Sequence, residues 1–134
     1  MFKILVLASN PQGTDQLRLD QEIRAIEDAF RTGEKRERFR VISKVAVKIS
    51  DLQSFLRREN PRMVHFCGHG TGSQGLVLAT ELGEKQSVGT EALAELFRLF
   101  EQKVECVVLN ACYSEVQGVA INQHINYVIA LVTS

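Results

Sequence analysis

Two stretches of this sequence place an imidazole and a thiol just beyond apolar runs. His69 follows the run 63–67, and Cys112 follows the run 104–110. Both runs contain the apolar and β-branched residues typical of strands buried on both faces. Because the carboxyl ends of parallel strands meet at one edge of a sheet, neighbouring strands would bring the imidazole beside the thiol. A helix predicted just after Cys112 would stabilise the reactive thiolate through the partial positive charge of its N-terminus.

Other residues near these strand ends are candidates for the same site. Glycine at position 70 would let the backbone approach a substrate carbonyl without a side chain in the way. Ser9 and Asn10 follow another apolar run and, with Cys67, are candidates for lining the cleft. Cysteines are also often small buried hydrophobes, so packing in the core is favoured for Cys67 and is the alternative for Cys112.

A metal site and a phosphate-binding loop are the alternatives to a thiol nucleophile in this region. His65, Cys67 and His69 alternate along one predicted strand, which suggests a metal site with Cys112 as a further ligand. Successive same-side residues on a strand are roughly 6.5 to 7 Å apart, too far for three of them to hold one tetrahedral zinc. The glycines within 68–72 suggest a phosphate-binding loop, but they lead into a predicted hairpin instead of a helix. We therefore expect neither a metal nor a nucleotide cofactor.

Composition restricts the class of protein. The chain has 134 residues, a length that suits one domain, and its 16 basic residues balance its 16 acidic residues. Neutral charge does not favour nucleic acid binding, and glutamates interrupt the basic segment 31–40. Three cysteines, of which Cys106 is expected in the core, favour reduced thiols in the cytoplasm. Residues 1–8 are too short for a membrane span and lack a signal-peptide layout, so we expect a soluble protein with no membrane association.

Apolar periodicity predicts an α/β domain with a mostly parallel sheet and helices on both faces. Strands are expected at 3–8, 39–47, 63–67, 104–110 and 126–132, and a hairpin at 76–88. Helices are expected within 15–31, from Ser50 to about residue 60, from Thr90 to about residue 100, and from Ser114 to about residue 124. Ser50 and Ser114 each precede a glutamine by three residues, which predicts two capping boxes, and Thr90 is expected to cap the third helix.

Three motifs give residues 2–132 a resemblance to a known family. They are the stretches 64–70 (VHFCGHG), 91–97 (EALAELF) and 107–114 (VVLNACYS). The chain resembles the CHAT domain, a bacterial branch of the caspase-like cysteine peptidases that also include metacaspases, gingipains and separases. The resemblance implies a caspase-like three-layer sandwich with strand order 2-1-3-4-5. It also implies that His69 is the base, Cys112 the nucleophile, and the backbone amides of Gly70 and Cys112 the oxyanion donors.

The end of the chain departs from the family pattern. CHAT domains normally continue past the fifth strand through a glycine-methionine turn, a helix, and a further strand and helix. This sequence has Ala130 at the glycine position and ends four residues later. We therefore expect 1–134 to be a single domain truncated after its fifth strand, and its C-terminal strand to pair in a homodimer or with a partner chain. The resemblance implies a protein or peptide substrate and a repeat or sensor module in bacterial signalling or defence. The alternative is a catalytically inactive interaction domain.

Overall fold

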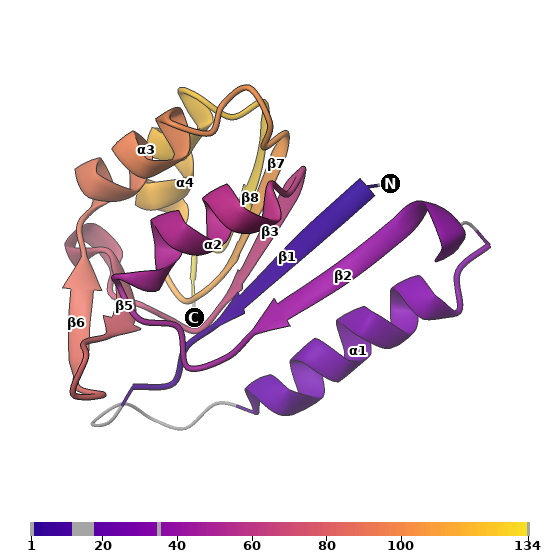
Figure 1. Ribbon diagram of the computed structural model, residues 1–134. Coiled ribbons are helices and arrows are strands. Elements are labelled where there is room, and N and C mark those ends of the chain that lie inside the picture. The colour runs from indigo at the N-terminus through magenta and orange to yellow at the C-terminus, as the bar shows by residue number, and fades with distance from the viewer. Residues whose placement is uncertain (1, 12–17, 35, 134) are drawn as a thin grey trace.

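Five parallel strands form the central sheet of the computed structural model, which describes residues 2–11, 18–34 and 36–133 (Figure 1). Their order is β2-β1-β3-β7-β8, and every neighbouring pair is parallel. The strands are β1 (Phe2–Ala8), β2 (Phe39–Lys44), β3 (Met63–Cys67), β7 (Cys106–Asn110) and β8 (Tyr127–Ala130). The order of the five predicted strands is therefore confirmed. Strands β1, β3 and β7 lie in the interior of the sheet, where both faces can be covered.

Helices cover both faces of this sheet, but unequally (Figure 1). Helix α1 (Leu19–Arg31) lies on one face. Helices α2 (Asp51–Glu59), α3 (Thr90–Arg98) and α4 (Glu115–Asn122) lie on the other. Short 3-10 turns occur at Arg36–Arg38 and Gly72–Gln74. No helix in the described ranges is both long and apolar enough to cross a membrane.

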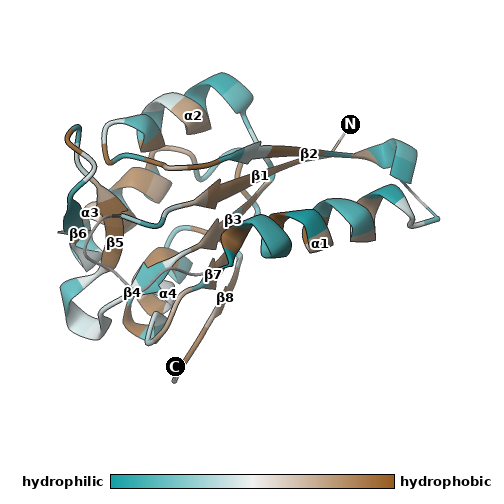
Figure 2. Cartoon of the chain, turned by 90° about the horizontal axis from the view of Figure 1, so that it is seen from below, coloured by the Kyte–Doolittle hydropathy of each residue, from teal (hydrophilic) through white to brown (hydrophobic). Residues whose placement is uncertain are grey.

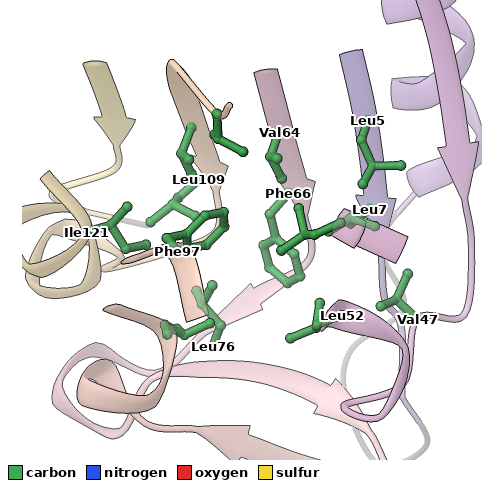
Figure 3. Close-up of a cluster of buried hydrophobic side chains, with 14 of the residues drawn as sticks. Leu5, Leu7, Val47, Leu52, Val64, Phe66, Leu76, Phe97, Leu109 and Ile121 are labelled. Atoms are coloured by element: carbon green, nitrogen blue, oxygen red, sulfur yellow. The ribbon is translucent and has the colours of Figure 1, made fainter. Parts of the chain in front are cut away.

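Alternation along the strands divides the apolar side chains between two cores. Leu5 and Leu7 of β1 belong to the larger core, which also contains residues of β3, β5, β7 and the three helices on that face. Figure 3 shows how these side chains converge on Phe66 from several elements. The residues that alternate with them in β1, including Ile4 and Val6, pack instead with Leu19 and Ile23 of α1. The period of two along a strand thus gives β1 one apolar surface for each helical layer.

Helix α1 leaves part of its face of the sheet uncovered. Its buried partners lie in β1 and at the end of β3. On the same face of β7 and β8, Cys106 is half-buried, while Tyr127 and Ile129 are 68% and 61% exposed. The expectation that Cys106 lies in the core is therefore wrong, because that face of β7 has no helix above it among the described residues.

A small antiparallel sheet interrupts the alternation of strands and helices. It consists of β4 (His69–Gly70), β5 (Leu76–Ala79) and β6 (Lys85–Val88), with β5 in the middle. All four residues of β5 are buried, whereas β6 is mostly exposed. This is the hairpin expected at 76–88, and the structure adds His69 and Gly70 to it as a third short strand.

The predicted helix caps do not form. Ser50 makes no cap hydrogen bond, and its hydroxyl donates instead to Oε1 of Glu81 at 2.6 Å. Gly89 occupies the N-cap position of α3, so Thr90 is the first helical residue instead of the cap. Ser114 makes no cap hydrogen bond either. In two of these three places, the serine hydroxyl has a longer-range partner that the local spacing does not reveal.

Candidate functional site

The register of β3 against β7 brings the two candidate catalytic residues to one edge of the sheet. Cys67 pairs with Asn110, the last residue of each strand. The amide of Gly68 continues the ladder by donating to the Asn110 carbonyl at 3.2 Å. His69 and Cys112 each follow this last pair by two residues. The structure therefore places both residues where parallel strands end, which is where ligands bind in open α/β sheets.

Contact between main chains joins the two segments just beyond the strands. A Cβ atom built on Gly70 would overlap the carbonyl oxygen of Cys112 and touch Cβ of Ala111. The backbone at position 70 therefore lies directly against the backbone of the candidate nucleophile. Only glycine leaves room for this approach, and the reason is space, since Gly70 does not have a positive φ.

The His69 ring is half-buried and is held from the side of β1. Its Nε2 atom lies 3.3 Å from Oδ1 of Asn10. An amide oxygen can only accept a hydrogen bond, so this contact suits the tautomer of His69 that carries its proton on Nε2. Within the described residues, no hydrogen bond joins the ring to the Cys112 thiol. Catalytic hydrogen bonds are often loose before substrate binds, and they tighten in the complex.

The three candidate cleft residues have different surroundings. Asn10 lines a pocket of about 300 Å³ between the ends of β1 and β2, whose wall includes Ala8, Leu19 and Val45. Ser9 is fully buried, and its hydroxyl donates to the Val47 carbonyl at 3.3 Å. Cys67 is also fully buried, beneath α1. The side chains of Ser9 and Cys67 are therefore both enclosed; for Cys67 this is the packing that the sequence favours, whereas Ser9 was expected to line the cleft.

A tight turn carries Cys112 from β7 into α4. Tyr113 has a left-handed backbone, with φ of 53°, and its side chain is exposed. The buried Ser114 hydroxyl donates to the Leu109 carbonyl and accepts from the amide of Leu131. One hydroxyl thus fastens the turn both to the end of β7 and to the segment after β8. This is the role that Ser114 has in place of the predicted capping box.

Gln117 is a structural residue of this region that the sequence did not reveal. It is fully buried, and its Nε2 atom donates to the Gly72 carbonyl at 2.7 Å and to the Thr90 hydroxyl at 2.8 Å. The side chain thereby links α4, which follows Cys112, to the loop that follows His69. Its spacing from Ser114 had suggested a capping box, and no local pattern distinguishes that role from the observed one.

The three thiols differ in burial and electrostatics, and all three are free. Burial raises the pKa of Cys67 far above its ordinary range, and the nearby Glu22 carboxylate raises it further. Burial also raises the pKa of Cys106. Both residues are thus held as protonated thiols. Cys112 is half-buried in the turn beyond β7, on the same edge as His69.

Comparisons with known proteins agree with this architecture. The model of the CHAT domain family matches residues 7–133. A curated relative, the Roc-COR-CHAT protease of an unknown prokaryotic organism, is 25% identical over 134 residues. That alignment includes 95% of this chain but only 13% of the relative, so the chain spans a small part of that protein's length. With a family match over almost its whole length and the caspase-like α/β arrangement described above, the chain belongs to the CHAT domain family.

Proposed function

We propose that this domain is a cysteine endopeptidase that hydrolyses peptide bonds through a dyad of His69 and Cys112. The observation that carries the proposal is the pairing of Cys67 with Asn110, because it puts the segments bearing the imidazole and the thiol at one sheet edge. The family match and the relative named as a protease support peptidase chemistry in general. The raised pKa values of Cys67 and Cys106 support the choice of Cys112 as nucleophile.

The proposed reaction assigns a separate task to each ring nitrogen of His69. Asn10 holds Nε2 of His69, so Nδ1 takes the proton from Cys112 and the thiolate attacks the scissile carbonyl. The backbone amides of Gly70 and Cys112 donate hydrogen bonds to the oxyanion that forms. The imidazolium then returns its proton to the leaving amine, which releases the new amino terminus and leaves an acyl-enzyme. Finally, His69 deprotonates a water molecule that hydrolyses the thioester, and the free thiol is restored.

The substrate is an extended protein or peptide segment, and the reaction takes place in the cytoplasm of a prokaryote as part of signalling or defence. Three free cysteines support a reducing compartment. The name of the relative joins a Roc-COR part to its CHAT part, in line with a CHAT domain that is linked to a further module. Exposed apolar residues on β8 support completion of the sheet by a partner chain or a second copy.

Labelling with a limiting thiol-reactive probe tests the dyad in the full-length protein. We expect Cys112 to label fastest, and Cys112→Ala to abolish both labelling at this position and peptide hydrolysis. His69→Ala should lower hydrolysis by about 10²–10⁴-fold, the usual contribution of a general base. Matched controls are Cys106→Ala and His124→Ala, because both side chains lie away from this edge and should leave the rate unchanged. Full activity in Cys112→Ala would refute the dyad.

A catalytically inactive docking domain is the second candidate. It is favoured by the lack of a hydrogen bond between the His69 ring and the Cys112 thiol among the described residues. In that case Cys112 would label no faster than Cys106, His69→Ala would not slow the labelling, and a library of peptides would yield no cleavage. The same labelling experiment therefore separates the two candidates.

A further inference from the structure

A second cluster of reactive side chains lies beneath α1, on the opposite face of the sheet from the main core. Glu22 of α1 meets His65 and Cys67 of β3 there, and one ligand atom from each lies within 4.8 Å of the other two. The His65 Nε2 atom is 3.8 Å from Oε1 of Glu22. The side-chain amide of Asn110 in β7 donates a hydrogen bond through Nδ2 to the same carboxylate oxygen. Strand β3 thus supplies a nitrogen and a sulfur donor, α1 supplies an oxygen donor, and β7 contacts the carboxylate.

The cluster contains a polar atom whose bonding is incomplete. Nε2 of His65 is buried, and no hydrogen bond reaches it from any described residue. Leaving a buried nitrogen without a partner is destabilising, so such atoms are rare in native structures. The neighbouring Glu22 carboxylate is only 28% exposed, and no lysine or arginine among the described residues forms an ion pair with it. A cation bound here would give the His65 ring nitrogen a partner and would neutralise the Glu22 carboxylate.

We propose that Glu22, His65 and Cys67 bind a thiophilic divalent cation, with Zn²⁺ as the best fit. Zinc takes thiolate, imidazole and carboxylate ligands in a four-coordinate site, and water or the amide oxygen of Asn110 would supply the fourth. A thiolate ligand favours zinc over magnesium or calcium. Binding releases the Cys67 proton to solvent, and the resulting thiolate and carboxylate balance the two charges of the cation.

The spacing argument that excludes a metal held by three residues of one strand does not apply here. Only His65 and Cys67 come from the strand, where they are same-side neighbours, and Glu22 reaches them from the helix above. Two neighbouring side chains of one strand and a third from the helix above can direct their ligand atoms toward one ion, which three side chains of a single strand cannot do. The ion would join α1 to the end of β3, directly before the segment that carries His69. The site does not depend on peptidase activity, so the two proposals can fail separately.

Titration of the metal-free 134-residue protein with Co²⁺ tests the site without reference to catalysis. A cysteine ligand produces a sulfur-to-cobalt charge-transfer band, and excess Zn²⁺ should displace the cobalt and remove it. We expect stoichiometric binding in the parent protein and loss of the band in Cys67→Ser. The matched controls Cys106→Ser and Cys112→Ser should keep the band, since neither thiol belongs to the cluster.

Cys67 is buried among apolar side chains, so Cys67→Ser could weaken folding by itself. Glu22→Gln avoids that difficulty, because Glu22 is partly exposed on a helix. It should lower the affinity for Co²⁺ by about tenfold or more while circular dichroism remains that of the parent. Zn²⁺ should also raise the melting temperature of the parent more than that of Glu22→Gln. The proposal is overturned if the parent shows no band, if Cys67→Ser keeps it, if Cys112→Ser loses it, or if Glu22→Gln binds as the parent does.

Discussion

At the scale of single residues, the three cysteines differ enough to be told apart chemically. Cys67 is fully buried under α1 with a raised pKa, Cys106 is half-buried on the uncovered face of β7 with a raised pKa, and Cys112 is half-buried in the turn after β7. A thiolate alkylates and a thiol does not, so a raised pKa lowers reactivity at neutral pH. Reactivity should therefore follow the surroundings of each cysteine instead of its position in a strand.

We expect iodoacetamide to modify Cys112 first, Cys106 much more slowly, and Cys67 only after unfolding in denaturant. The measurement is mass spectrometry of peptides from the native and the denatured protein after timed alkylation. Raising the pH should increase the rate at Cys106, because the thiolate fraction grows as the pH approaches its raised pKa. Equal native labelling of Cys67 and Cys112 would mean that β3 does not lie beneath α1 as described.

At the scale of elements, the site depends on how closely two loop segments approach. Gly70 ends β4 of the small sheet, and Cys112 lies in the turn between β7 and α4. A side chain at position 70 would overlap the Cys112 carbonyl. Any residue but glycine must therefore push the hairpin and the turn apart, which moves His69 relative to the nucleophile.

Gly70→Ala should destabilise folding by about 1–3 kcal/mol, as expected when an atom is forced into a closely packed region. Peptide hydrolysis should fall further than the unfolded fraction explains, because the dyad is displaced in molecules that still fold. Urea denaturation and kinetics on the same samples check both parts. Gly89→Ala is the control, since nothing lies within 4 Å of a Cβ there and the cost is about 0.5 kcal/mol for a poorer helix cap. Unchanged activity in Gly70→Ala would contradict the described contact.

At the scale of the whole molecule, β8 is the edge of the sheet and pairs with β7 alone among the described strands. Figure 2 shows it at the border of the molecule, with the C-terminal residues extending from it. Tyr127 and Ile129 are exposed, whereas Val128 and Ala130 pack against the larger core. The edge therefore combines unpaired backbone groups with an apolar outer face, and that combination favours strand pairing between chains.

We expect the 134-residue chain to self-associate through β8 and Ile129→Lys to reduce that association, because the added charge opposes packing of the apolar face. Sedimentation velocity over a concentration series measures the effect. Ile129 is 61% exposed, so its replacement should leave the melting temperature nearly unchanged. Val128→Lys is the contrasting variant, since it would place a charge at a partly buried position against the core and should lower the melting temperature. A parent chain that stays monomeric at every concentration would contradict association through β8.

The sequence alone determined the layout of this protein to a large extent. The five parallel strands, the hairpin after His69 and the placement of His69 and Cys112 beyond strand ends follow from apolar runs and their interruptions, and the strand order follows from the resemblance to the CHAT domain. Those patterns indicate which faces of each segment are buried. A strand that is buried on both faces is typical of a parallel sheet covered by helices. The first residues of the helix expected within 15–31 lie outside the described part of the chain.

Only the tertiary structure decided which polar groups meet. Ser50 and Ser114 have cap spacing, yet their hydroxyls bond to Glu81 and Leu109, and Gln117 reaches a loop 45 residues away in the chain. Cys106 and Cys67 both lie on apolar strands, but α1 covers one and leaves the other half-buried. A hydrogen bond or a covering helix depends on residues far apart in sequence, and the local pattern of a strand or helix carries no record of them. For the same reason, the convergence of Glu22 on His65 and Cys67 emerges only when α1 is laid across β3.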